Sequence, residues 1–448
     1  MTQRITRRTF LETTTRLAAA AALPRYAWDQ RQSRRAPNIV FIVSDDLGYG
    51  DLSLTGRSDY TTPVIDQIGR DGAVLTQAYS SAPVCTPTRV AFMTGRYPAR
   101  YTVGLYEPLT TQRIGLEPRP ATLARLLKNA GYDTALVGKW HLGLLPEFHP
   151  LRHGFDEFYG FLGPAADYIS HVDNETRKAS YFQDGDRPVR VDGYLTDLFT
   201  DRAVQIVMRQ RQRPFFLSLQ YNAPHWPWQG RGDAAYPDSM GMAAGGSPET
   251  YARMVKSLDE GVGRVLDALH RRGLERDTLV VFTSDNGGER FSSMGPFSHG
   301  KMTLWEGGIR VAAVARWPGV IASGSRCEQA CATFDLTATA AALAGTRADS
   351  AAPFDGIDLM PALRGGAPRP RDLYWRVTQR QQYKAMRSGD WKYLVTKDGA
   401  YLFDLASDPA EKRDRRVEQA TVFSELERKY AAWEQQMLKP VPLPASER

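Results

Sequence analysis

Cys85 stands in a short segment, Cys85-Thr86-Pro87-Thr88-Arg89, whose residue types suit chemistry at a helix N-terminus. Pro87 fits the first turn of a helix, because its missing N–H costs no hydrogen bond there. A helix that begins here would place the Cys85 side chain where the helix dipole stabilises a negative charge. Arg89, one turn along, would add a permanent positive charge on the same face. A buried structural cysteine is the alternative interpretation.

Two pairs of oxygen-bearing side chains each follow an apolar run: Asp45 with Asp46, and Asp285 with Asn286. Carboxylate and amide oxygens are the ligands that hard cations prefer in proteins. The alternative is that these residues cap helices or form turns, as Asp and Asn commonly do after strands. The two pairs together favour a metal site, with Ca²⁺ as the first choice and Mg²⁺ as the second.

Four basic side chains, Lys139, His141, His225 and Lys301, occur in similar short segments after apolar runs or glycines. A glycine precedes each lysine, which lets the charge approach an anion closely. A solvated lysine on the surface is the alternative. Weaker candidates for contact with a substrate, as rings that could stack on a sugar or aryl group or line its pocket, are His171, Trp226, Trp228 and His299.

Four apolar runs predict buried strands, and each ends just before polar groups named above; they span residues 38–44, 134–137, 215–219 and 279–283. In open α/β sheets, ligands bind outside the carboxyl ends of the strands. Amphipathic segments between these runs predict helices at 121–129, 197–210 and 247–269. The alternation predicts an α/β fold with a central, mostly parallel sheet sandwiched by helices.

The character of the chain changes after about residue 344, and a Gly- and Pro-rich segment at 364–370 resembles a linker. Short strand-like pieces and a polar helix from Val422 then predict a small C-terminal antiparallel-sheet subdomain with one helix. The expected organisation is a signal segment at 1–35, a catalytic α/β domain at 36–363 and a C-terminal α+β subdomain at 371–448.

The N-terminal segment Thr6-Arg7-Arg8-Thr9-Phe10-Leu11 looks like a twin-arginine export signal, and a weakly apolar stretch follows at 17–23. An exposed basic arm is the alternative. The stretch is too short to span a membrane, so we expect no membrane anchor. The sequence predicts export by the twin-arginine machinery to the periplasm or the medium. Any modification of Cys85 would precede export, because this route carries folded proteins.

The composition of the 448-residue chain, 42% hydrophobic and 24% charged, is ordinary for a globular protein. The formal net charge of +7 comes from scattered Lys and Arg residues, which argues against a nucleic-acid partner and suits an anionic substrate. The three cysteines, Cys85, Cys327 and Cys331, indicate no disulfide framework.

A set of motifs covers most of the chain: residues 44–51 (SDDLGYGD), 85–89 (CTPTR), 138–143 (GKWHLG), 154–158 (GFDEF), 222–225 (NAPH), 285–288 (DNGG), 300–301 (GK), 305–311 (WEGGIRV), 401–405 (YLFDL) and 408–409 (DP). Together they resemble the type I, formylglycine-dependent sulfatases, related to the arylsulfatase A group of the alkaline-phosphatase-like superfamily. Two positions depart from the family pattern. Thr88 stands where serine or alanine is commoner, and Ala312 stands where proline is common.

The resemblance implies hydrolysis of a sulfate monoester of a carbohydrate or an aryl alcohol. A maturation enzyme would oxidise Cys85 to formylglycine, and the hydrate of this aldehyde would attack sulfur. The divalent cation would be held by residue 85 together with Asp45, Asp46, Asp285 and Asn286.

The same resemblance implies a role for each basic residue. Lys139, His225 and Lys301 would neutralise the sulfate oxygens, and His225 or Lys301 would protonate the departing alcohol. His141 would take the proton from the second hydroxyl, which expels sulfate and restores the aldehyde. Arg89 would hold the formylglycine.

Two other functions stay open. A two-metal phosphodiesterase, or a phosphonate monoester hydrolase of the same superfamily, is the first. A two-metal site needs several histidine ligands, whereas the chain has seven histidines in all and Asn286 follows Asp285. A non-catalytic exported binding protein with an unmodified Cys85 is the second.

Overall fold

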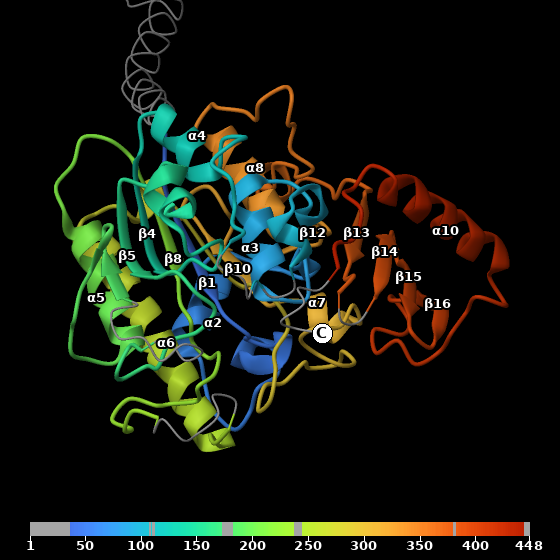
Figure 1. Cartoon of the computed structure of the whole chain (residues 1–448), viewed down its shortest axis with the longest axis horizontal. Coiled ribbons are helices and arrows are strands. Elements are labelled where there is room, and N and C mark those ends of the chain that lie inside the picture. Colours follow the sequence, from blue (N-terminus) through green and yellow to red (C-terminus); the bar gives the residue numbers. More distant parts are fainter. Residues whose placement is uncertain are drawn as a thin grey trace, which may run out of the picture. The chain divides into compact units, whose positions relative to one another are not determined.

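The computed structural model describes residues 36–106, 109, 113–172, 182–236, 244–379 and 382–442. The chain divides into two units, Met1–Pro37 and Asn38–Arg448, and the second contains the helices and strands of the described residues (Figure 1). The expected export signal at 1–35 lies outside the described residues. No described helix has the length and apolar character that a membrane span needs.

Four parallel strands lie side by side in the middle of a ten-stranded sheet, in the order β9 (Thr278–Ser284), β1 (Asn38–Ser44), β8 (Phe215–Gln220) and β4 (Asp133–Lys139). These are the four strands that the sequence predicted. Every residue of β1, β8 and β9 is buried, which is typical of parallel strands with helices on both faces. The carboxyl ends of these four strands therefore meet at one edge of the sheet.

Shorter strands extend the sheet on both sides, and some of them run antiparallel. The complete order is β11 (Ser325–Cys327), β2 (Ala73–Leu75), β10 (Ala313–Arg316), β9, β1, β8, β4, β5 (Glu157–Phe161), β6 (Phe182–Asp184) and β7 (Arg187–Pro188). A separate two-stranded sheet pairs β3 (Ala78–Tyr79) with β12 (Cys331–Ala332).

Alternate residues of β1 pack into two different apolar clusters, one on each face of the sheet. Ile39 and Phe41 pack with residues of α3 (Cys85–Thr94) and α4 (Leu123–Asn129), while Val40 and Ile42 pack with residues of the other helical layer. The first layer also contains α8 (Thr333–Leu343), and the second contains α2 (Pro63–Arg70), α5 (Leu195–Met208) and α6 (Pro248–Arg271). The sheet is therefore sandwiched by helices, as predicted.

The three predicted helices are present, with small shifts at their ends. Helix α6 begins after its N-cap Ser247, whose hydroxyl accepts a hydrogen bond from the Thr250 N–H, and Pro248 takes the first position. Helix α5 begins and ends two residues earlier than predicted, and α4 begins two residues later. Short 3₁₀ helices lie in the connections: Tyr49–Asp51, Ser53–Thr55, Pro98–Arg100, Val103–Leu105, Pro146–Phe148, Pro150–His153 and Glu275–Asp277.

A second, four-stranded antiparallel sheet forms the C-terminal part of the fold, with strands in sequence order: β13 (Asp372–Arg376), β14 (Lys384–Ser388), β15 (Trp391–Thr396) and β16 (Gly399–Asp404). Helix α10 (Ala420–Glu434) packs on it through Leu426, Tyr430 and Trp433. Two one-turn helices, α7 (Glu306–Ile309) and α9 (Met360–Leu363), precede this sheet in the chain. The expected fold class, a mostly parallel α/β sheet plus a small antiparallel sheet with one helix, is confirmed.

Gly138 shows how tightly β4 packs against β8 next to the polar edge of the sheet. Its φ is +115°, and a Cβ atom added there would lie 1.9 Å from the Gln220 carbonyl oxygen. We expect Gly138→Ala to lower the free energy of unfolding by at least about 2 kcal/mol more than Gly131→Ala does. Gly131 is the matched control, because its φ is also positive (+91°) but a Cβ there meets no atom of the described residues within 4 Å. Urea denaturation of both variants measures the difference, and equal losses would contradict this packing.

Candidate active site

Two pairs of polar residues meet at the carboxyl ends of β1 and β9. Ser44 and Ser284 are partners in the two strands, so Asp45-Asp46 and Asp285-Asn286 begin at the same level. The Asp46 N–H donates to Asp285 Oδ1 at 3.3 Å, and Asn286 Nδ2 donates to Asp46 Oδ1 at 2.7 Å. All four side chains are buried, with at most 2% of each residue exposed.

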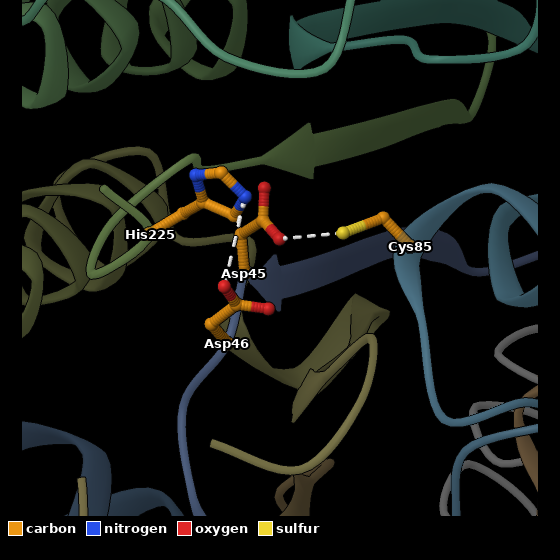
Figure 2. Close-up of side chains that lie close together, drawn as sticks. All are labelled: Asp45, Asp46, Cys85 and His225. Carbon is orange, nitrogen blue, oxygen red and sulfur yellow. Dashed lines mark hydrogen bonds and ion pairs between the residues drawn. The ribbon is translucent and has the colours of Figure 1, made fainter. Parts of the chain in front are cut away.

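Cys85 is the first residue of α3, as the sequence predicted, and its side chain reaches this edge. Its Sγ lies 3.2 Å from Asp45 Oδ1, and ligand atoms of Asp45, Asp46, Cys85 and His225 all lie within 4.8 Å of one another (Figure 2). Burial, followed by the carboxylates of Asp285 and Asp45, raises the pKa of the thiol well above its usual value. For the unmodified thiol, burial and these two carboxylates therefore outweigh the stabilisation that the helix N-terminus gives to an anion.

Arg89 binds the buried carboxylate of Asp285. Its Nη2 lies 2.9 Å from Asp285 Oδ2, and its Nη1 donates to the Lys139 carbonyl and to Gln220 Oε1, each at 3.1 Å. Arg89 therefore joins α3 to the ends of β4, β8 and β9. The sequence did not indicate Gln220 as its partner, although Gln220 is the last residue of β8.

Two lysines pair with the other two carboxylates. Lys139 Nζ contacts Asp45 Oδ2, and both side chains are fully buried. Burial acts to raise the pKa of Asp45, but the Lys139 charge and its cationic neighbours outweigh burial and lower this pKa overall. Lys301 Nζ lies 2.7 Å from Asp46 Oδ2. Lys301 Nζ is also 3.6 Å from Glu289, a half-exposed neighbour that the sequence reasoning missed although it directly follows the DNGG motif.

His225 is held as a neutral ring beside Asp46. Its Nδ1 lies 2.6 Å from the Trp226 carbonyl oxygen, so Nδ1 carries the proton and Nε2 is bare. Nε2 lies 3.6 Å from Asp46 Oδ2. Burial lowers the pKa of His225 to about 4, although Asp46 and Asp45 act to raise it. At neutral pH His225 is therefore a hydrogen-bond acceptor at Nε2.

His141 approaches the other side of the α3 N-terminus. Its Nε2 lies 3.2 Å from Thr86 Oγ1 and 3.2 Å from the Leu109 carbonyl oxygen, so Nε2 carries the proton. Nδ1 is buried and has no hydrogen-bond partner among the described residues. Burial, with the charges of Lys139 and Arg89, lowers the pKa of His141 well below its usual value. The result is a neutral imidazole with a free acceptor atom.

The donor set of this edge fits a hard divalent cation. Carboxylate oxygens of Asp45 and Asp46 converge there, and Asp285 and Asn286 contact Asp46 directly. Asn286 Oδ1 is buried and has no hydrogen-bond partner among the described residues, which a cation would supply. His225 lies in the same cluster of possible metal ligands. The sequence analysis predicted a role for His225 in proton transfer and did not predict it as a metal ligand.

The four weaker substrate candidates lie in different surroundings. Trp226 is half-buried and its ring centroid is 4.4 Å from that of His225, so it borders the cluster. Trp228 is buried and packs against Phe291, 5.0 Å between ring centroids, while His299 is exposed and packs against Trp305 at 4.7 Å. His171 is buried elsewhere, with Nε2 2.9 Å from the Gly193 carbonyl oxygen and its ring on Phe182. No described contact joins His171 to the cluster around Asp45 and Asp46.

Comparison with known proteins assigns the family. The family model described as Sulfatase matches residues 37–346, more than half of the chain. The chain belongs to the sulfatase family. The mouse (Mus musculus) N-acetylgalactosamine-6-sulfatase is 36% identical over 365 residues, which cover 76% of this chain and 68% of that protein. The mouse steryl-sulfatase is 33% identical over 498 residues, covering 85% and 78%.

Solved sulfatase structures also match the fold. The crystal structure of Ps i-CgsB in complex with k-i-k-neocarrahexaose superimposes with a TM-score of 0.84 at 31% identity and covers 92% of this chain and 96% of that one. The resemblance drawn from the sequence is thus confirmed, including the alkaline-phosphatase-like fold. This sulfatase is a sulfuric ester hydrolase, so the non-catalytic alternative is set aside.

The buried ion pair between Arg89 and Asp285 can be tested by protein stability, without an enzyme assay. In protein stripped of divalent cations, we expect Arg89→Met to lower the free energy of unfolding by roughly 3 kcal/mol or more, because it removes the guanidinium that contacts the buried Asp285 carboxylate. The control is Arg413→Met, which removes a pair with Glu418 whose side chains are 64% and 46% exposed; we expect at most about 1 kcal/mol there. Urea denaturation measures both, and a loss as small for Arg89 as for Arg413 would contradict the buried pairing.

Proposed function

We propose that this sulfatase hydrolyses a sulfate monoester through a formylglycine formed from Cys85 and with one divalent cation, Ca²⁺ in preference to Mg²⁺. One observation carries the proposal: Cys85 Sγ lies 3.2 Å from Asp45 in a cluster that also holds the buried cations Arg89 and Lys139 and the largely buried Lys301. The unmodified residue is a neutral, buried thiol and therefore a weak nucleophile. Conversion of the Cys85 side chain to formylglycine would replace this weak nucleophile with a hydroxyl group.

Formylglycine supplies, as its hydrate, two hydroxyl groups on one carbon: one for attack on sulfur and one whose deprotonation releases sulfate. A divalent cation supplies Lewis acidity, which polarises a sulfate oxygen and lowers the pKa of a hydroxyl. The fit of Asp45, Asp46, Asp285 and Asn286 to a hard cation supports this part of the proposal. The remaining chemistry belongs to the basic side chains around the cluster.

Lys139 and Lys301 would neutralise the oxygens of a sulfate group bound beside the cluster. Each already contacts a carboxylate of the cluster, so neither has to move far to meet an anion. Fixed positive charges stabilise the charge that shifts onto oxygen during transfer of the sulfuryl group. Both terminal nitrogens of Arg89 are engaged, with Asp285 and Gln220, so its proposed role is to hold the cluster and residue 85 in place.

Two groups can protonate the departing alcohol. Lys301 holds a proton at neutral pH, because Asp46 raises its pKa well above the usual value against the effect of burial. His225 is neutral alone, and an added sulfate anion would raise its pKa and let Nε2 take and deliver a proton. On the opposite side, Nδ1 of His141, which has no partner among the described residues, is suited to accept the proton from the second hydroxyl.

We propose a carbohydrate sulfate as the natural substrate class. The support is likeness to a relative named N-acetylgalactosamine-6-sulfatase and to a structure solved with k-i-k-neocarrahexaose. Trp226, half-buried beside His225, offers a ring face to a sugar at the edge of the cluster. The proposal also includes maturation of Cys85 before export and delivery to the periplasm or the medium, for which residues 6–11 are the support.

The experiment that tests this function combines mass spectrometry with turnover. We expect the peptide with residue 85 to carry an aldehyde in place of the thiol in active protein, and we expect sulfated galactosides to be hydrolysed. Cys85→Ser should keep the melting temperature but lose activity by more than about 10³-fold, because the second hydroxyl is missing. Full activity with an unmodified Cys85, or phosphate diesters cleaved far faster than every sulfate ester, would contradict the proposal.

The cation has its own test in thermal melting. We expect Ca²⁺ to raise the melting temperature of the wild-type protein, since a ligand at about 100 times its Kd stabilises the folded state by about 2.7 kcal/mol. Asn286→Ala should reduce this shift. Asn38→Ala is the matched control, because Asn38 is also buried but begins β1, at the strand's other end, and its shift should stay complete. A melting temperature that no divalent cation changes would contradict the metal site.

A further inference from the structure

Lys301 lies on a loop, residues 298–307, that has almost no regular structure. Residues 298–305 precede the one-turn helix α7, and the Gly307 N–H donates to the Ser298 carbonyl oxygen at 2.9 Å, which closes the loop at its base. Inside the loop, the Lys301 N–H donates to the Gly288 carbonyl oxygen at 3.0 Å. Unlike Lys139, which ends β4, Lys301 has no strand ladder to fix its position.

Two consecutive residues of the C-terminal part hold both ends of this loop. Ser298 Oγ donates to the Ala410 carbonyl oxygen at 2.5 Å, and the Glu306 N–H donates to Glu411 Oε2 at 2.6 Å. The partners are separated by more than 100 positions in the sequence. Glu411 has a φ of +54°, a region that residues other than glycine rarely adopt. The backbone of Glu411 is thus strained in the conformation in which its carboxylate binds the first N–H of α7.

A buried ion network fixes this carboxylate. Lys392 Nζ, from β15, lies 2.8 Å from Glu411 Oε1 and 3.0 Å from Glu306 Oε1, and all three side chains have 0% exposure. Glu306 Oε2 also accepts hydrogen bonds from Tyr79 at 2.8 Å and Arg310 at 2.9 Å. Figure 1 shows α7 beside the C-terminal sheet, where this network forms.

We propose that Glu411 is a positioning residue for sulfate ester hydrolysis, because it holds the 298–307 loop so that Lys301 stays at the catalytic cluster. The inference rests on the proposed function in one respect: Lys301 must act on the sulfate group. Displacement of a reacting or stabilising group by about 1 Å costs on the order of 10²-fold in rate. A loop anchored at both ends limits such displacement.

The variant Glu411→Ala removes the anchor with little risk to the fold, because Lys392 keeps its partner Glu306 and no buried charge is left unpaired. Glu411→Gln retains an oxygen that can accept from the Glu306 N–H. Glu434→Ala is the matched control: it removes a carboxylate that pairs with Lys384 at 2.7 Å in the same C-terminal subdomain, away from the loop. With 4-nitrophenyl sulfate as the probe, we expect Glu411→Ala to lower kcat by about 10-fold or more. The Glu411→Gln and Glu434→Ala variants should stay within about threefold of wild type.

Two further measurements separate positioning from a general structural role. In the Lys301→Ala background, Glu411→Ala should lower kcat by no more than about twofold, because the group that it positions is already gone. Amide hydrogen exchange over residues 298–307 should be at least about 10-fold faster in Glu411→Ala than in wild type and unchanged in Glu434→Ala. Unchanged exchange in Glu411→Ala, or kcat losses that multiply with Lys301→Ala, would overturn the inference. Faster exchange in a matured protein that hydrolyses no sulfate ester would refute the proposed function while leaving the anchoring of the loop established.

Discussion

Three buried carboxylates at the carboxyl ends of two adjacent strands are the constraint on which this structure depends. Asp45, Asp46 and Asp285 lie so close together that, out of water, their repulsion and desolvation cost several kcal/mol each unless cations compensate them. The compensating charges come from three places that are far apart in the sequence: helix α3, the end of β4 and the 298–307 loop. The strand order β9-β1-β8-β4 is what brings these places together. Under the proposed function, the cations that compensate these carboxylates in the folded chain are also the ones that an anionic substrate would meet.

The environment of Cys85 shows which of two opposing electrostatic effects is larger. A helix N-terminus stabilises an anion by at most about 2 kcal/mol. Desolvation of a fully buried thiolate, with two carboxylates nearby, costs more, and so the pKa of the thiol is raised. A cysteine at this position is therefore preserved as a neutral thiol, protected from ordinary thiolate chemistry. If residue 85 supplies the nucleophile, as proposed, a hydroxyl of a carbonyl hydrate suits this environment, because it needs no negative charge on sulfur.

Features that depend on neighbouring residues could be predicted from the sequence, and features that depend on distant partners could not. The four central strands and α6 follow from apolar periodicity and from Ser247 and Pro248, so their bounds are close to those predicted. The motifs indicated the cluster residues but not their pairing. The contact of Arg89 with Gln220 results from the tertiary arrangement alone, and so does the position of His141 Nδ1, which meets no hydrogen-bond partner in the described part of the chain. His171 was a candidate for contact with the substrate because of its residue type, but its ring packs on Phe182, a contact that the sequence does not indicate.

The support that each group proposed to act in catalysis needs follows from the element that carries it. Groups at strand ends, such as Asp45 and Lys139, take their positions from a ladder of backbone hydrogen bonds on both sides. Cys85 and Arg89 take theirs from a buried helix that packs against α8. A group on a loop has neither, and its position must come from contacts made for that purpose. This requirement explains why a small antiparallel sheet outside the central sandwich contributes a fully buried lysine, Lys392, to the structure. Under the inference drawn above, the C-terminal sheet acts on the chemistry through the loop that it holds, since none of its described residues is among the side chains of the cluster.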